Sequence, residues 1–179
     1  MDDLLSSRAR LYANHYRSLL TSDAIPLRST FDIRAVKTIL DSFVILEPLS
    51  LEIVRFRLVG TREVQRYGQD VTGGNYLDFC PPERRLSAYA AFETMANHAC
   101  GMQAVIRSKT SVGVDILNEA VGFPFRCDRT GAIHLIFQSN DLDRDTHWKG
   151  QDAAVNNHAT ILLRTYLDIG FGIPAPVSV

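Results

Sequence analysis

The sequence predicts an α+β protein: a five-stranded antiparallel sheet, with short helices and one long helix gathered on one face, and a flanking helix at the N-terminus. Three observations indicate this fold. Two strand-like runs precede a stretch of helix signals, and three strand-like runs follow it. The first two runs are joined by so short a link that they should form an antiparallel hairpin. Helices on one face of such a sheet are the economical way to bury its apolar side.

Length, composition and charge are those of an ordinary globular protein. The chain has 179 residues, of which 46% are hydrophobic and 22% charged, enough to bury a core in one domain with extensions. The net charge of -1 provides no basic field for nucleic acid. No apolar run is long enough to cross a bilayer, and the acidic start does not resemble a secretory signal. We therefore expect a cytoplasmic protein with neither a nucleic-acid nor a membrane partner.

The N-terminal segment is expected to form an amphipathic helix. Its apolar side chains recur at helical spacing, at Leu5, Ala9, Tyr12, Tyr16 and Leu19. The helix either packs against its own domain or forms a dimer contact. The dimer-interface candidates are Leu5, Tyr12, Tyr16 and Leu19. The Pro-containing break that follows divides the chain into a helix and linker (1–30), a central domain (31–141) and a C-terminal extension (142–179).

Local patterns predict the elements before the long helix. In FDIRAVKTIL, Asp32 can cap a helix whose apolar residues recur at helical spacing. SFVILEP is a β-branched run stopped by Pro48, and IVRFRLVG alternates apolar and charged residues, so both are expected to be strands. Thr61 can cap a short helix that Gly68 closes. After a Gly-containing loop, Asn75 can cap the one-turn helix YLDF.

The remaining elements are a long helix and three strands. PPERRLSAYAAFETMANHACG has Pro in its first turn, Glu83 near its positive end and Gly101 after its last periodic residue. The strands are expected in MQAVIRSKTSV, DILNEAVGFPFRCD and GAIHLIFQSND, which Gly, Asp and Thr turn residues separate. The apolar tail TILLRTYLDIGFGIP fits a strand as well as a helix, so its structure stays open.

Two strands, short helices, a long helix and three strands, in this order, resemble the layout of a PAS domain. The segments FRLVGTREVQRYGQDVTGGNYLDFCPPERR and LDIGFGIP also resemble a family of small single-PAS proteins of alphaproteobacteria, which includes a motility-regulating protein. The resemblance runs from about residue 31 to residue 141, plus the tail. It implies the PAS fold, a cytoplasmic regulatory or sensory role and a tendency to dimerise, but no shared ligand or activity.

A set of mostly aromatic side chains is expected to converge between the sheet and the helices. These ligand-pocket candidates are Phe56, Leu58, Tyr67, Phe79, Phe92, Met95, Phe125 and Phe137. They form either plain core or the wall of an apolar pocket, in which Tyr67 or Gln138 would be the polar group. Such a pocket would take a small, largely apolar metabolite.

Haem, flavin and metal are disfavoured as cofactors. His98 falls on the polar side of its helix and His134 alternates away from the apolar side of its strand, so neither is placed to ligate haem in the pocket. Flavin photochemistry of the PAS type needs an Asn-Cys-Arg context, which the cysteines of this chain lack. Cys80, Cys100 and Cys127 are widely separated and odd in number, so we expect buried thiols without a disulfide framework or metal site.

An enzyme is the alternative from a different class. A small α+β barrel isomerase or lyase acting on an apolar substrate would need a carboxylate at the mouth of its pocket. The candidates for that carboxylate are Asp78, Glu83, Glu93 and Asp115. Each of them, like Glu119, is expected to be solvated instead.

The three possible functions predict different cavities. An enzyme should place a histidine or carboxylate with a perturbed pKa inside its cavity. A receptor should line its cavity with Phe, Leu and Ile and keep ionisable groups outside. A ligand-free interaction scaffold should have a filled core and no cavity.

The expected function is that of a cytoplasmic regulatory protein without catalysis. It would bind a small ligand, a protein partner or both, and each would favour one arrangement of the helical wall or of the dimer. Its output would travel through contact with a protein partner, since no kinase, cyclase or DNA-binding segment is evident. A homodimer is expected as the assembly.

Overall fold

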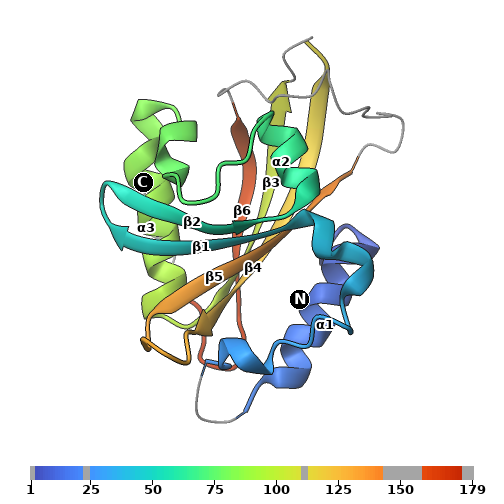
Figure 1. The fold of residues 1–179 in the computed structure, drawn as a ribbon, viewed down its shortest axis with the longest axis vertical. Coiled ribbons are helices and arrows are strands. Elements are labelled where there is room, and N and C mark those ends of the chain that lie inside the picture. Colours follow the sequence, from blue (N-terminus) through green and yellow to red (C-terminus); the bar gives the residue numbers. More distant parts are fainter. Residues whose placement is uncertain (1–2, 22–24, 110–112, 143–158, 175–179) are drawn as a thin grey trace.

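The computed structural model describes residues 3–21, 25–109, 113–142 and 159–174. The helices and strands, with 3₁₀ helices marked η, are α1 (Ser7–Leu19), η1 (Arg28–Thr30), η2 (Lys37–Ser42), β1 (Phe43–Ser50), β2 (Ile53–Val59), α2 (Thr61–Tyr67), η3 (Tyr76–Phe79), α3 (Pro82–Asn97), β3 (Gly101–Lys109), β4 (Asp115–Arg126), β5 (Ile133–Asp141) and β6 (Thr160–Leu167). A central sheet separates α3 from α1, which lie on opposite sides of it (Figure 1). None of the described helices is long and apolar enough to cross a membrane.

The strands form one antiparallel sheet in the order β2-β1-β5-β4-β3-β6. The α+β fold and the five predicted strands are confirmed, and the structure adds a sixth strand. This strand, β6, comes from the apolar tail and pairs with β3, from Gly101 opposite Leu167 to Arg107 opposite Thr160. The predicted C-terminal extension (142–179) thus contributes an edge strand, while its residues 143–158, with His147 and His158, lie outside the described residues.

The segment FDIRAVKTIL does not form the predicted α-helix. It makes turns followed by the 3₁₀ helix η2. The Asp32 carboxylate accepts a hydrogen bond from the backbone N–H of Arg34 (2.9 Å), as expected of a cap. The backbone after it closes i, i+3 bonds instead of an α-helical ladder, such as Ile39 N–H to the carbonyl of Val36 (3.0 Å). Val36 and Ile39 are buried, at 0% and 1% exposure, whereas Ile33 is 58% exposed. The apolar spacing therefore marked two core contacts and not a continuous helical face.

Alternation along the strands divides the core into two clusters, one on each face of the sheet. On the face that α2, η3 and α3 cover, called the α3 face, the cluster includes Val44, Leu46, Phe56, Leu77, Phe92, Met95, Met102, Leu135 and Phe137. On the face that α1 covers, called the α1 face, it includes Tyr12, Tyr16, Ile39, Phe43, Val121, Phe123, Phe125 and Ile136. Neighbouring strand residues such as Phe43 and Val44 therefore belong to different clusters.

Helix α1 belongs to the core of its own chain, which corrects its assignment to a dimer interface. Tyr12 and Tyr16 are both 0% exposed. Their hydroxyl groups donate to the carbonyls of Ile136 (2.8 Å) and Pro124 (2.9 Å) on the sheet. Leu19 is partly buried against the same cluster. Of the four interface candidates, only Leu5, which precedes the helix, is exposed, at 53%. The apolar stripe of the helix itself covers the α1 face.

Side-chain caps and one close backbone contact determine where α1, η3 and α2 begin. The side chain of Ser6 accepts from the N–H of Ala9 at the start of α1, and the side chain of Asn75 caps η3 as predicted. Helix α2 begins after Gly60, and Thr61 is its first residue rather than its cap. A Cβ at Gly60 would overlap the carbonyl of Asp41, so only glycine lets β2 turn into α2 at this point.

Candidate ligand-binding site

A cavity of about 170 Å³ lies on the α3 face, between the sheet and the layer formed by α2, η3 and α3. Large side chains from the helices and the sheet form part of its wall. The space exists because several other wall positions carry small side chains, namely Ala88, Ala91, Ala104 and Ala120. Two of these face each other across neighbouring strands, since Ala104 of β3 pairs with Ala120 of β4.

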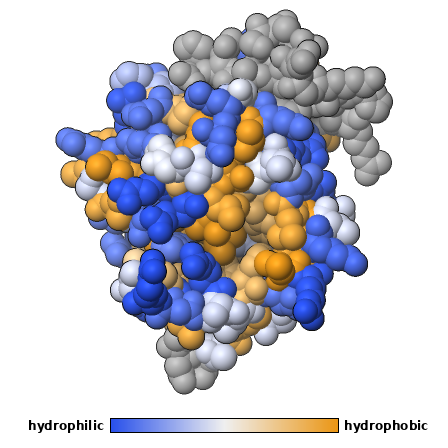
Figure 2. Space-filling model, viewed as in Figure 1, coloured by the Kyte–Doolittle hydropathy of each residue, from blue (hydrophilic) through white to orange (hydrophobic). Residues whose placement is uncertain are grey.

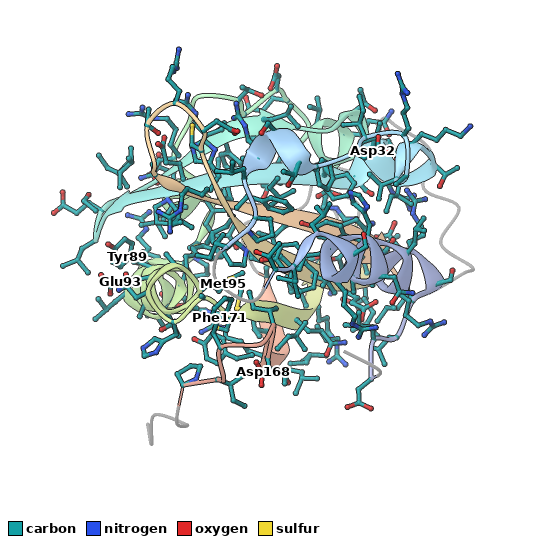
Figure 3. The ribbon with its side chains drawn as sticks, turned by 90° about the horizontal axis from the view of Figure 1, so that it is seen from below. Asp32, Tyr89, Glu93, Met95, Asp168 and Phe171 are labelled. Carbon is teal, nitrogen blue, oxygen red and sulfur yellow. The ribbon has the colours of Figure 1, made fainter. Side chains whose placement is uncertain are left out.

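Four of the predicted pocket residues line this cavity, and two more lie directly behind its wall. The lining residues are Tyr67, Phe79, Phe92 and Phe137. Phe56 and Met95 are 0% exposed in the same cluster but do not line the space. Figure 3 looks along α3 and shows Met95 on the side of the helix that faces the sheet. The aromatic rings support one another, with centroids 4.9 Å apart for Tyr67 and Phe79 and 5.7 Å apart for Phe92 and Phe137.

Leu58 was predicted to line the pocket, but it lies outside the core. The β1–β2 ladder has a register shift: Leu46 is opposite Phe56, whereas the preceding residue, Ile45, is opposite Leu58. A bulge of this kind breaks the period-two alternation, so Leu58 does not share the buried side of Phe56 and is 45% exposed. The face that β1 and β2 cross has a band of apolar side chains at its centre, bordered by polar ones (Figure 2).

Phe125 also lies away from the cavity, because β4 presents it on the α1 face. Its ring contacts Tyr16 (centroids 5.1 Å apart) and Phe31 (5.5 Å). Gln138, which was proposed as the polar group of the pocket, also lies outside the cavity, because the period-two alternation along β5 places its side chain on the α1 face. Gln138 is 0% exposed on the α1 face, where its side-chain nitrogen donates to Ser42 Oγ (2.9 Å).

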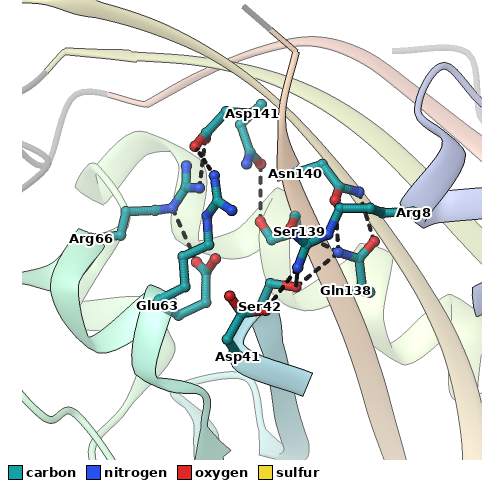
Figure 4. A network of polar contacts seen from close by, with 11 residues as sticks. Arg8, Asp41, Ser42, Glu63, Arg66, Gln138, Ser139, Asn140 and Asp141 are labelled. Carbon is teal, nitrogen blue, oxygen red and sulfur yellow. Dashed lines mark hydrogen bonds and ion pairs between the residues drawn. The ribbon is translucent and has the colours of Figure 1, made fainter. Parts of the chain in front are cut away.

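One end of the cavity is polar, which the sequence did not predict for this wall. Helix α2 presents Glu63 and Arg66 to the space, and both side chains are buried. Arg66 donates from Nη2 to Asp141 Oδ1 (2.7 Å), and its Nε lies 3.1 Å from Glu63 Oε2. Arg62 donates to the other oxygen of Asp141 (2.7 Å). Figure 4 shows Glu63, Arg66 and Asp141 meeting at the end of β5.

Burial and mutual charge determine the ionisation of this cluster. Burial raises the pKa of Glu63, with Arg66 acting in the opposite direction. Burial alone would lower the pKa of Arg66, but the carboxylates of Glu63 and Asp141 raise it above its usual value. Burial would also raise the pKa of Asp141, but the charges of Arg66 and Arg62 hold it below its usual value. Asp141 is the better-stabilised anion because it accepts charge-assisted hydrogen bonds from two arginines.

Four buried side-chain atoms of the wall have no hydrogen-bond partner within the described ranges. Two of them, Nε of Arg66 and Nε of Arg164, belong to arginines that donate through another nitrogen, and Arg66 Nε also lies 3.1 Å from Glu63. The other two are Oε1 of Glu63 and Nδ2 of Asn118, in residues that are 4% and 3% exposed. Asn118 Oδ1 accepts from Ser139 Oγ (3.1 Å), and Asn118 lies opposite Asp141 in the β4–β5 register. We call the group formed by Glu63, Arg66, Asn118, Ser139 and Asp141 the polar end.

Two further arginines lie elsewhere on the wall, where β6 approaches α3. Arg84 donates to the carbonyl of Ala159 (3.1 Å), and Arg164 donates to the carbonyl of Ser87 (3.2 Å). These bonds join the tail to the long helix. The edge strand therefore helps to close the cavity, since Ala159, Ile161 and Arg164 are all part of its wall.

The carboxylates proposed for catalysis do not line the cavity. Asp78, Glu83, Glu93 and Asp115 are all exposed. Glu119 was expected to be solvated as well, but it is 0% exposed. Its carboxylate accepts from the backbone N–H groups of Leu5 (2.8 Å) and Ser6 (2.9 Å) and from Gln103 Nε2 (2.7 Å). Glu119 thus holds the start of α1 against the sheet.

The histidines and cysteines of the described residues do not gather at one site. His98 is exposed, and His134 is buried on the α1 face with Nε2 3.6 Å from Glu47. Burial lowers the pKa of His134, and Glu47 opposes that shift. Cys80 lines the cavity, and burial raises the pKa of its thiol, against the nearby arginines. Among the described residues, no three His, Cys, Asp or Glu side chains group into a metal site.

Sequence reasoning missed the polar end for an identifiable reason. The i, i+3 spacing of Glu63 and Arg66 was visible, but it is equally typical of a solvated helix surface. Which side of so short a helix faces the core depends on its contact with Asp141, which is 75 residues away from Arg66 in the sequence.

The chain belongs to the PAS domain family, which matches residues 5–136. The match includes α1, in keeping with the packing of that helix on the sheet. A crystal structure of a Rhodobacter sphaeroides LOV protein is similar over 65% of this chain and 71% of its own, with a TM-score of 0.45 and 13% sequence identity. None of the curated proteins compared matches the chain.

Proposed function

We propose that this chain is a sensory or regulatory PAS domain that binds a small, largely apolar molecule and acts without catalysis. One observation carries the proposal: the cavity beneath α3 has a mostly apolar wall with a few convergent polar groups. That combination is typical of small-molecule sites. A filled scaffold would have no such space.

The output would leave through the N-terminal helix. Asn118 and Glu119 are neighbours on β4 but face opposite sides of the sheet, one toward the cavity and one toward the start of α1. On β5, Asp141 binds Arg66 (Figure 4), while the preceding residue, Asn140, donates to Ser6 Oγ (2.9 Å). A ligand that shifts α2 or β4 would therefore change the contacts that hold α1. A ligand can shift this equilibrium only by binding the two arrangements differently.

An isomerase or lyase is the second candidate, and Glu63 is the observation that favours it. A buried carboxylate with a raised pKa on a cavity wall fits a general acid or base. Its contact with Arg66 supports the structural role instead, because an ion-paired carboxylate is held in place by its partner. Glu63→Gln separates the two roles. A receptor should retain ligand binding in this variant, whereas an enzyme should lose turnover while its substrate still binds.

Native mass spectrometry of the gently purified protein, followed by a thermal-shift screen of small apolar compounds, tests the receptor function. We expect a retained or added mass and a rise in Tm, since a ligand that binds only the folded state stabilises it. The variant Ala120→Leu, which fills the cavity, is the matched control and should show neither. An unchanged mass and Tm across the screen would contradict the proposal.

Homodimerisation, a cytoplasmic location and membership of the alphaproteobacterial single-PAS group remain predictions. Tyr12 and Tyr16 no longer support a dimer contact, because both are buried within the chain. Sedimentation of the wild-type protein at several concentrations tests the homodimer directly.

A further inference from the structure

The polar end of the cavity has one unused acceptor and one unused donor. Glu63 Oε1 and Asn118 Nδ2 are buried atoms of the same wall and lack partners within the described part of the chain. A buried polar group without a partner destabilises the fold. Something with both a donor and an acceptor is therefore expected to occupy this end, whether water or a group of the ligand.

The charges around these two atoms favour an uncharged group. Glu63 and Asp141 carry two negative charges, and Arg62 and Arg66 carry two positive charges, so the cluster is balanced. A carboxylate placed here would meet the free oxygen of Glu63. An ammonium group would meet Arg66 and the Asn118 donor, and it has no acceptor for the latter.

A hydroxyl group carries both of the partners that these two atoms lack. It has one O–H donor for Glu63 Oε1 and lone pairs that accept from Asn118 Nδ2. It also reproduces the hydrogen bonds of a water molecule, so displacing such a water would lose no hydrogen bond.

The volume of the cavity limits the size of the rest of the ligand. The cavity of about 170 Å³ is close to the engineered apolar cavity of about 150 Å³ that holds benzene. The wall away from the polar end is formed mainly by aromatic, aliphatic and alanine side chains, with Arg84 and Arg164 where β6 approaches α3. A single ring or a short branched chain fits this volume.

We propose that the polar end selects a hydroxyl group, so that the ligand class is a small phenol or a compact apolar alcohol. The hydroxyl donates to Glu63 and accepts from Asn118, and the hydrocarbon part lies against Phe79, Phe92 and Phe137. This inference rests on the proposed function, because it names the ligand class of the same cavity.

Three matched probes test it by isothermal titration of the full chain: 4-ethylphenol, ethylbenzene and 4-ethylbenzoate. They share the same ring and differ in a hydroxyl, a hydrogen or a carboxylate. We expect 4-ethylphenol to bind at least about tenfold more tightly than ethylbenzene, and 4-ethylbenzoate to bind more weakly than either. Equal affinity of the phenol and the hydrocarbon, or tighter binding of the carboxylate, would overturn the hydroxyl assignment.

Two variants locate the preference. Asn118→Leu removes the donor with nearly the same side-chain volume, and Asn118→Asp removes it while keeping an acceptor for Ser139. Either variant should reduce the preference for the phenol over the hydrocarbon to about threefold or less. Asn140→Leu is the control, since Asn140 is a buried asparagine on the neighbouring strand whose side chain faces Ser6 and Gln138. It should leave the preference unchanged. A preference that survives both Asn118 variants would overturn the assignment.

Failure of this inference differs from failure of the receptor function. Equal binding of ethylbenzene and 4-ethylphenol leaves a working apolar pocket and refutes only the role of the polar end. No binding by any of the three probes, together with an empty screen, refutes the receptor function and the inference with it.

Discussion

The same period-two alternation of side chains builds both faces of the sheet, but the α1 face is filled and the α3 face keeps a cavity. On the α1 face, Tyr12, Tyr16, Phe43, Phe123 and Phe125 fill the space with interlocking rings, such as the stacked pair Tyr16–Phe123 with centroids 4.3 Å apart. The α3 face also has aromatic residues, but it places alanines between them and keeps a cavity. The comparison shows that side-chain size at inward positions, and not their hydrophobicity, separates a supporting core from a site.

Polar groups also differ between the two faces where they meet α1 and the cavity, although the α1 face has a buried atom without a partner within the described residues, His134 Nδ1. Both tyrosine hydroxyls of α1 donate to sheet carbonyls, and the Glu119 carboxylate accepts three hydrogen bonds. On the α3 face, the buried atoms Glu63 Oε1 and Asn118 Nδ2 lack partners within the described residues. Satisfied polar groups fix α1 on the sheet, whereas unsatisfied ones leave the α3 face able to bind.

The largest expected effect is the loss of an aromatic ring from the filled face. Phe123→Ala should lower the free energy of unfolding by about 3–5 kcal/mol, because Phe123 is 0% exposed and its neighbours cannot collapse around the gap. Phe79→Ala, at the partly exposed wall of the cavity, should cost less than about 2 kcal/mol. Urea denaturation measures both. Equal losses would contradict the contrast between the faces.

Acid should act on the α3 face through Asp141. Its pKa is lower in the folded state than in the unfolded state, so its contribution is complete above the unfolded value of about 3.9 and is lost as pH falls through the folded pKa. Glu63 has a raised pKa, so its contribution has the opposite sign: stability increases as pH falls from the folded pKa toward the unfolded value of about 4.3.

Asp141→Asn tests this assignment. The variant should be destabilised by about 2–3 kcal/mol at neutral pH, because Arg62 and Arg66 lose their shared carboxylate. It should also lose less stability than the wild type below about pH 4. Urea denaturation across pH measures both effects, with the exposed Asp78→Asn as the control. A variant with the stability and acid profile of the wild type would show that Asp141 is not a stabilising anion.

Two glycines give a matched test of free space. A Cβ at Gly101 would lie 2.6 Å from the ring of Phe123 on the filled face, and a Cβ at Gly122 would overlap the ring of Phe137 on the cavity wall. Gly101→Ala should therefore cost about 1–3 kcal/mol, as overpacking does. Gly122→Ala should cost less, because Phe137 has the cavity to move into, and it should weaken ligand binding. Thermal unfolding of the two variants decides this, and a greater loss at Gly122 would contradict it.

Enlarging a buried alanine is expected to have effects of opposite sign on the two faces. Ala120→Leu should stabilise the protein by about 0.5–1.5 kcal/mol, since it fills the cavity. Ala13→Leu, at a buried alanine of α1 that is 2% exposed, should destabilise it by about 1–3 kcal/mol. Thermal or urea unfolding measures both. A destabilised Ala120→Leu protein would indicate that the cavity is not free space.

Local patterns were sufficient to predict most of the fold. The alternation of Val54 and Phe56, the capping side chain of Asn75 and the Pro and Glu83 at the start of α3 each act within a few residues, so they could be read directly. The predictions that were wrong depended on something further away. The segment after Asp32 forms turns and a 3₁₀ helix that place Val36 and Ile39 in the core, and Leu58 was displaced by a bulge in the pairing with β1.

The candidate site likewise has one part that the sequence could predict and one part that it could not. The chain composition and strand period determined that aromatic rings such as Tyr67, Phe92 and Phe137 would meet on one face of a sheet, because period-two alternation is a local property. Tertiary packing alone decided that Glu63 and Asn118 would line one end of a cavity, with Asp141 behind them on Arg66, and that α1 would cover the opposite face. These side chains come from three separate elements, and burial of a charge depends on the partner that folding brings to it.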